Sequence, residues 1–271
     1  MREWIASLPL RSHAAVLSAL LDAVERDERL RFVELCCSVA RGTGDELSDL
    51  DLGLGVADAA WPDALDVVAP MLRGLSDVVD LLEHQIDQWG SRPHRRFFAQ
   101  YSTGVQVDLV ALPASVRTGL PAGSVALYDP DGRLAQPLAV PTERADADQV
   151  REWAFLAWVA LADADKYLRR GSAWEAADRV EQARREVWRL AAAGEGVPFP
   201  AFGLTSLVDH ASPMPAGIDE TLVPLDAGKL RDAAIRLARI VRREAERAAA
   251  ATGSPAPQEL ARYVTGRLGR E

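Results

Sequence analysis

The chain has 271 residues, of which 31 are basic and 40 acidic, so its formal net charge is −9. A composition of 48% hydrophobic and 26% charged residues excludes disordered, collagenous and disulfide-scaffold proteins. An acidic surface repels phosphate backbones, which argues against a nucleic-acid partner. No stretch approaches the roughly 18 apolar residues of a membrane span, and Met1-Arg2-Glu3-Trp4 does not resemble the apolar core of a signal peptide. We therefore expect a cytoplasmic protein without a membrane partner.

The first 142 residues contain 12 basic and 20 acidic side chains and predict a mixed α and β domain. Leu17, Leu20, Leu21 and Val24 follow helical spacing, with Ser12 as the expected cap. A second helix is expected from Pro62 to near Gly74. Alternating apolar residues between turn signals predict strands over Arg31–Cys37, Leu50–Val56, Val78–Ile86, Arg96–Tyr101, Val105–Leu112 and Val125–Tyr128.

Residues 143–271 are rich in alanine, arginine and tryptophan at helical spacing. Helices are expected over Asp146–Arg170, Ser172–Ala193 and Asp226–Ala251, with a short one after Pro257. A Pro- and Gly-rich stretch, Gly194–Gly217, separates the second from the third. The pattern predicts two domains, 1–142 and 143–271, in an α+β protein with a mixed sheet followed by a helical bundle.

Two carboxylates in one predicted strand are the first candidates for chemistry. Asp49 and Asp51 are two residues apart, so in a strand their side chains project to the same face. Magnesium prefers carboxylate oxygens, and such a pair suits metal-assisted phosphoryl transfer. By itself, the pair also fits a solvated turn or strand edge.

The neighbouring residues strengthen the metal interpretation. Ser38 lies where a strand gives way to a turn, whose N–H groups suit phosphate oxygens, and Arg41 adds a charge-assisted contact. Asp108 is a single acid in the otherwise apolar run Val105–Leu112, where a carboxylate is costly unless it faces a cleft, a metal or a partner.

Together, Cys37-Ser38, Ala40-Arg41-Gly42, Ser48-Asp49-Leu50-Asp51 and a strand-borne Asp108 resemble the polymerase-β-type nucleotidyltransferase superfamily, most of all its aminoglycoside and lincosamide enzymes. The resemblance implies that Ser38 holds nucleotide phosphates, that Asp49 and Asp51 bind magnesium, and that Asp108 completes the metal site. It also places Arg41, Ser48 and, from the first C-terminal helix, Lys166 among the nucleotide-binding residues. A solvated helix face is the alternative for Lys166 and its neighbours Asp163 and Asp165.

Cys37 departs from the family pattern, which usually has glycine at this position. A cysteine side chain crowds the approach of a phosphate and disfavours positive φ. We expect Cys37 to keep ordinary strand dihedrals and to point its side chain into the core; weakened nucleotide binding is the alternative.

These residues predict magnesium-dependent transfer of a nucleoside monophosphate from an NTP, expected to be ATP, to a hydroxyl group of a small molecule. The acidic first half suits a cationic acceptor such as an aminoglycoside. The alternative, favoured by Cys37, is a non-catalytic nucleotide-binding or regulatory module. A polymerase or tRNA-processing enzyme is disfavoured by the net charge and by the presence of only two lysines, Lys166 and Lys229. The sequence leaves the oligomeric state, including a homodimer, open.

Overall fold

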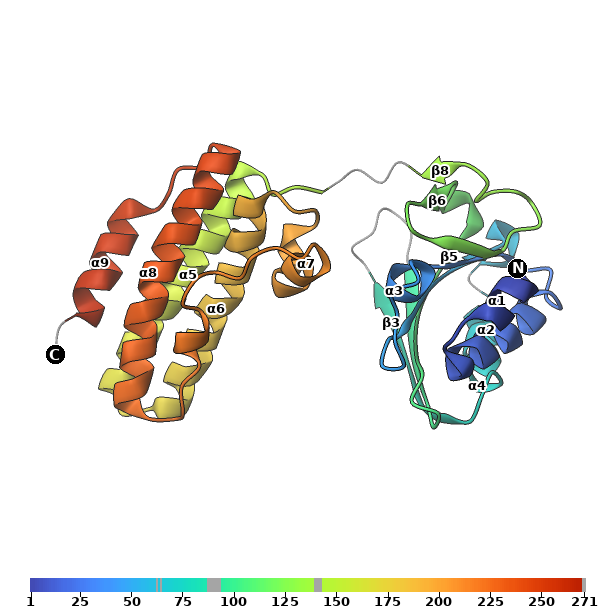
Figure 1. Cartoon of the computed structure of the whole chain (residues 1–271), viewed down its shortest axis with the longest axis horizontal. Helices are drawn as coiled ribbons and strands as arrows, with labels where there is room; N and C mark the ends of the chain where they lie inside the picture. Colours follow the sequence, from blue (N-terminus) through green and yellow to red (C-terminus); the bar gives the residue numbers. More distant parts are fainter. Residues whose placement is uncertain (62, 64, 87–93, 139–142, 270–271) are drawn as a thin grey trace. The chain divides into compact units, whose positions relative to one another are not determined.

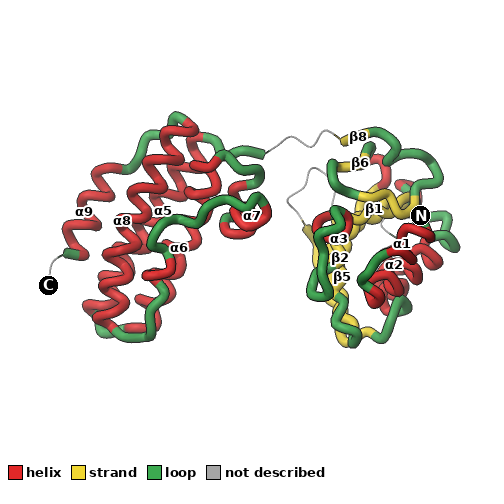
Figure 2. Tube along the Cα trace, viewed as in Figure 1, coloured by secondary structure: helices red, strands yellow, loops and turns green. Residues whose placement is uncertain are grey.

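The structure is a computed structural model, and it describes residues 1–61, 63, 65–86, 94–138 and 143–269. The chain divides into two compact units, Met1–Val140 and Pro141–Glu271. Figure 1 shows strands and helices in the first unit, and Figure 2 shows helices and loops in the second. The predicted domain boundary at residue 142 lies outside the described residues.

The described strands of the first unit form a six-stranded mixed sheet in the order β3-β4-β5-β2-β1-β7. Within this sheet β2 and β5 are parallel, and the other neighbouring strands are antiparallel. The strands are β1 (Leu30–Leu35), β2 (Leu50–Val56), β3 (Val78–Ile86), β4 (His94–Tyr101), β5 (Gln106–Pro113) and β7 (Val125–Tyr128). Two short parallel strands, β6 (Leu120–Pro121) and β8 (Pro137–Leu138), form a separate pair.

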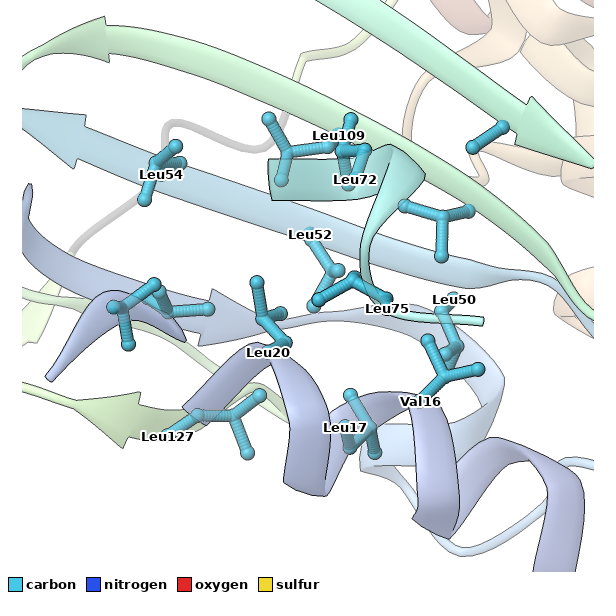
Figure 3. Close-up of a cluster of buried hydrophobic side chains, with 14 of the residues drawn as sticks. Val16, Leu17, Leu20, Leu50, Leu52, Leu54, Leu72, Leu75, Leu109 and Leu127 are labelled. Carbon is cyan, nitrogen blue, oxygen red and sulfur yellow. The ribbon is translucent and has the colours of Figure 1, made fainter. Parts of the chain in front are cut away.

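The helices α1 (Arg2–Ser7), α2 (Arg11–Val24) and α4 (Leu65–Arg73) lie together on one side of this sheet (Figure 1). The apolar stripe of α2 packs against alternate residues of the strands, because strand side chains two apart share a face. Figure 3 shows this core, in which Leu20 of α2 lies near Leu52 of β2 and Val16 of α2 lies near Leu50 of β2. The expected cap at Ser12 is wrong: α2 begins at Arg11, with Leu10 before it.

The opposite face of the sheet is built around two glycines of β2. Gly53 pairs with Glu34 of β1, and Gly55 with Phe32. A Cβ atom on Gly53 would lie 2.5 Å from Oε1 of Glu34, and one on Gly55 would lie 2.1 Å from the Phe32 ring. The missing side chains therefore let Glu34 and Phe32 lie across β2, and they leave Asp51 as the polar group of this strand on that face.

The second unit consists of the long helices α5 (Ala147–Arg169), α6 (Ala173–Glu195) and α8 (Ala227–Thr252), with α7 (Leu204–Asp209) and α9 (Gln258–Leu268). Asp146 and Gln149 form a capping box that fixes the start of α5. Trp158 is buried between the helices, among alanine, leucine and valine side chains. Short 3₁₀ helices lie at Asp58–Ala60, Ala114–Val116, Pro200–Phe202 and Asp219–Thr221.

One buried carboxylate joins three helices of this unit. Asp165 of α5 is fully buried, and it accepts hydrogen bonds from Arg169 at 2.9 Å and from Arg267 of α9 at 3.0 Å. Arg231 of α8 lies 3.4 Å from its other oxygen. The sequence left open whether Asp165 faces solvent or an acceptor, and the structure assigns it to a clamp between helices.

The predicted fold class is confirmed: the protein is α+β, with a mixed sheet and flanking helices followed by a helical region. The Pro- and Gly-rich stretch Gly194–Gly217 contains the short helix α7, which the sequence analysis did not predict. The expected helix start at Pro62 lies outside the described residues, and the helix begins at Leu65. No helix in the described part of the chain is long and apolar enough to cross a membrane.

Candidate functional site

Asp51 and Asp108 lie side by side in the middle of the sheet. The parallel register of β2 and β5 places them directly opposite each other, and paired residues of neighbouring strands project to the same face. This is the face opposite α2 and α4, because Leu50 and Leu52, the neighbours of Asp51 in β2, belong to the helix-covered core. The structure thus brings two of the three predicted acids together.

Asp49 directly precedes β2 and adds a third negative charge. Burial raises the pKa of Asp51, and the charges of Asp49 and Asp108 raise it further, whereas a hydrogen bond from Cys37 and the charge of Arg96 act in the opposite direction. Neighbouring carboxylates repel each other, so a positive charge between them would be stabilising.

Cys37 corrects one expectation. It is the first residue of α3 (Cys37–Ala40), with φ of 59°, and it is exposed rather than placed in a strand with its side chain in the core. Its backbone thus adopts the left-handed conformation that glycine adopts most easily. Desolvation of the thiol and its hydrogen bond to Asp51 raise the pKa of Cys37 to about 12, so at neutral pH the thiol is protonated and donates to the carboxylate.

The turn around α3 is fixed next to Asp51 by backbone contacts. The N–H of Cys36 donates to the carbonyl oxygen of Asp51 at 2.8 Å, so the chain enters α3 beside this carboxylate. Ser38 is the second residue of α3, and its carbonyl oxygen accepts from the N–H of Thr43 at 3.0 Å. Arg41 ends the helix, is exposed, and lies close to Gly123, where an added Cβ would be 3.3 Å from its Cγ.

Ser48 supports the loop that leads to Asp49. Its hydroxyl accepts from the N–H of Asp45 at 2.9 Å, and its carbonyl oxygen lies 2.7 Å from Nε2 of the buried His13. His13 of α2 thus anchors the residue before Asp49 to the helix layer. The contacts of Ser48 are structural, and its expected role in nucleotide binding stays a prediction.

Arg96 of β4 is a site residue that the sequence analysis did not identify. Its guanidinium donates two hydrogen bonds to Asp108, from Nε to Oδ1 at 2.8 Å and from Nη2 to Oδ2. It also stacks on Phe98, 4.4 Å from the ring centroid. The hydrogen bonds to Asp108 raise the pKa of Arg96, partial burial opposes this, and the negative charges of Asp108, Asp51 and Asp49 raise the pKa further. Strand pairing brings these residues together, and a single sequence does not reveal it.

Glu34 is a second acid on this face that the sequence analysis missed. It is 1% exposed, and Arg117 donates to its Oε1 at 2.6 Å, while Oε2 has no hydrogen-bond partner among the described residues. Burial raises the pKa of Glu34, and the charge of Arg117 opposes this only in part. Glu34 is the single acid in the apolar strand Leu30–Leu35, the same signal that identified Asp108.

Lys166 belongs to the second unit. Its Nζ lies 2.5 Å from Oδ1 of Asp163, one turn away on the same face of α5, and it also lies over the ring of Tyr167. The pairing of these two residues on one helix face agrees with their spacing. The expected contact of Lys166 with a triphosphate stays a prediction.

The donor set suits a divalent cation held in part by a nucleotide. Among the described residues, no group of three Asp, Glu, His or Cys side chains is arranged to hold a metal ion. Magnesium in phosphoryl-transfer sites usually binds one or two carboxylates, together with substrate phosphates and water. Asp49 and Asp51 match this pattern, and the Arg96 guanidinium shows that a cation is accommodated on Asp108.

The comparisons with known proteins are sparse. No family model and no curated protein matches the sequence. Among solved structures, an aminoglycoside 6-adenyltransferase from Bacillus subtilis aligns with 94% of this chain and 98% of its own, with a TM-score of 0.42 and 14% identity.

Proposed function

We propose that this protein transfers a nucleoside monophosphate from a nucleoside triphosphate to a hydroxyl group of a small molecule, with release of pyrophosphate. The parallel register of Asp51 and Asp108 carries this proposal, because it joins two strand-borne acids on the face opposite the helices. Asp49 directly before β2 and the left-handed turn at Cys37 beside Asp51 complete the arrangement. It combines a cation site with a turn that can receive phosphates.

The residues of the first unit divide the work between metal and phosphate. Asp49 and Asp51 would hold magnesium, which neutralises charge on the phosphates when it is bound. Ser38 and Arg41 would contact phosphate oxygens. Asp108 would complete the metal site or take the proton from the acceptor hydroxyl. Catalysis would then rest on positioning and charge neutralisation rather than on a covalent intermediate.

The acceptor class follows from charge. The first 142 residues carry a net charge of −8, and the candidate site pairs Asp51 with Asp108 on one face of the sheet, with Asp49 directly before β2. Negative surfaces concentrate cationic ligands, so we propose an aminoglycoside-like acceptor, which carries both amino and hydroxyl groups, and ATP as the nucleotide. Pyrophosphate release, measured with Mg-ATP and a panel of aminoglycosides and lincosamides, tests this choice; silence across the panel would exclude an antibiotic acceptor.

The site itself is tested with isosteric variants. Asp49→Asn and Asp51→Asn should each lower transfer by at least about a hundredfold, because each removes a charge that would hold the metal. Asp66→Asn is the matched control: this exposed acid lies in the first turn of α4, on the other side of the sheet. Thermal unfolding should show all three variants folded. Transfer that survives in Asp51→Asn would refute the proposed site.

One observation favours a second candidate, a nucleotide-binding module without catalysis. The thiol of Cys37 donates a hydrogen bond to Asp51, so one of the two proposed metal ligands already has a partner within the protein. A protein of this kind would bind the triphosphate, detected by calorimetry, but would release no pyrophosphate with any acceptor or with water.

A further inference from the structure

The contact between Arg96 and Asp108 is the least expected feature of the candidate site. Two parallel hydrogen bonds join the guanidinium to both oxygens of the carboxylate, which is the strongest geometry for this pair of groups. The Asp108 side chain is 12% exposed, whereas that of Arg96 is 38% exposed. The carboxylate is therefore held in place, and the arginine has solvent on one side into which it can move.

The surroundings show why a cation is needed at this position. Asp108 faces Asp51 across the parallel strands, and Asp49 lies close enough for its charge to act on both Asp51 and Arg96. Without a cation, the charges of Asp51, Asp108 and Asp49 would repel each other. Arg96 offsets part of this repulsion, and its stacking on Phe98 holds the guanidinium above the sheet.

The two oxygens that Arg96 occupies are those that a third metal ligand would need. Phe98 is the register partner of Asp108 in β4, and Arg96 lies two residues before Phe98, so its side chain reaches Asp108 diagonally across the strands. This diagonal reach gives the long arginine side chain alternative positions on the same face.

We propose that Arg96 is an internal competitor of the metal ion: it occupies Asp108 in the metal-free protein and must leave before a divalent cation can use this carboxylate. This inference about Arg96 rests on the proposed function, because the cation concerned is the one that Asp49 and Asp51 would hold. Arg96 would then lower the affinity of the site for a metal ion on its own. Binding of the metal ion to Asp108 would be coupled to the release of Arg96 from this carboxylate. The freed guanidinium remains on the same face, where it can contact an anionic ligand.

The test measures Mn²⁺ binding in the absence of any nucleotide, by the loss of the electron paramagnetic resonance signal of free Mn²⁺. Arg96→Gln removes the competing charge, so this variant should bind Mn²⁺ about tenfold more tightly than the unmodified protein. The double variant Arg96→Gln/Asp108→Asn should lose this gain, because the gain depends on the freed carboxylate. An affinity of Arg96→Gln equal to or below that of the unmodified protein would overturn the proposal.

Arg95→Gln is the matched control. Arg95 is the adjacent residue of β4, has a similar exposure of 34%, and lies 3.9 Å from Glu83 on the neighbouring strand. Adjacent strand residues project to opposite faces, so this variant should leave Mn²⁺ affinity unchanged. An equal gain in Arg95→Gln would show a general charge effect and would also overturn the proposal. Arg96→Lys keeps the charge but not the paired hydrogen bonds, and its affinity should lie between those of the unmodified protein and Arg96→Gln.

These outcomes are separable from the proposed function. If the unmodified protein releases pyrophosphate but Arg96→Gln gains no Mn²⁺ affinity, the inference about Arg96 fails and the proposed function stands. If no acceptor supports transfer while Arg96→Gln gains Mn²⁺ affinity through Asp108, the proposed reaction fails and the competition is supported. Thermal unfolding of each variant without metal shows that the comparison is made between folded proteins.

Discussion

Replacing Cys37 by glycine should stabilise the protein, although the substitution removes a side chain and its hydrogen bond. Cys37 has a φ of 59°, a conformation that costs a residue with a Cβ roughly 1–2 kcal/mol and costs glycine almost nothing. Against this gain, glycine lowers the unfolding free energy by about 0.5–1 kcal/mol, because the unfolded chain is more flexible at a glycine. The backbone alone should therefore gain roughly 0–1.5 kcal/mol, and a gain of about 1 kcal/mol corresponds to a rise in Tm of about 3 °C for a protein of this size.

Cys37→Ala separates the backbone from the thiol. Both variants lose the hydrogen bond to Asp51, but alanine keeps the Cβ and the unfavourable φ. The difference in unfolding free energy between Cys37→Gly and Cys37→Ala, measured by urea titration, should thus be about 1 kcal/mol in favour of glycine. A glycine variant no more stable than the alanine variant would refute the reasoning.

The same variants test nucleotide binding. The left-handed backbone is already present in the cysteine protein, so any effect of Cys37 on ATP comes from its side chain and from its contact with Asp51. Calorimetry with Mg-ATP should show tighter binding in both Cys37→Gly and Cys37→Ala. Unchanged affinity in both would show that the thiol does not limit binding.

Two further variants test the buried carboxylates through pH. Burial alone would raise the pKa of Asp165, but hydrogen bonds from Arg169 and Arg267 outweigh burial and lower the pKa. The ionised Asp165 therefore stabilises the folded protein fully above about pH 3.8, the ordinary pKa of the group. This stabilisation disappears as the pH falls through the lowered pKa. The unfolding free energy of Asp165→Asn at pH 7 should therefore be about 3 kcal/mol lower than that of the unmodified protein, and this difference should shrink in acid. A variant as stable as the unmodified protein at pH 7 would contradict the role of Asp165 as a clamp between helices. Burial raises the pKa of Glu34 despite Arg117, so the folded protein binds more protons there than the unfolded chain, and stability should fall as the pH rises from about 4.5 through the raised value. In Glu34→Gln, urea titrations at a series of pH values should show no such decrease of the unfolding free energy with rising pH. If the unfolding free energy of the variant depends on pH as that of the unmodified protein does, Glu34 is not the group responsible.

Local patterns in the sequence predict much of the fold. The helix spacing of the second half predicted α5, α6 and α8 to within a few residues of their observed ends, because long amphipathic helices repeat their signal over many turns. The six-residue helix α7 was missed, since it is too short for such a repeat and lies in a Pro-rich stretch.

The candidate site was predictable only in part. Asp49 and Asp51 stand out by their two-residue spacing, and Asp108 stands out because a carboxylate in an apolar strand is costly. The second argument would also have identified Glu34. Arg96 was not predictable, because its importance depends on which strands pair and in what register. The conformation of Cys37 was predicted wrongly, since the ordinary preference of a cysteine is overridden by the tight exit from β1 into α3.

The parallel pairing of β2 and β5 also constrains when the candidate site can form. Neighbouring parallel strands need a crossover connection, and here α4, β3 and β4 lie between them in the chain, so Asp51 and Asp108 meet from positions 57 residues apart. Contacts between such distant positions carry a large loop-closure cost and tend to form late in folding. During synthesis, a ribosome-bound chain that has not yet released β5 lacks the paired acids, so the proposed cation site can form only when the sheet is nearly complete.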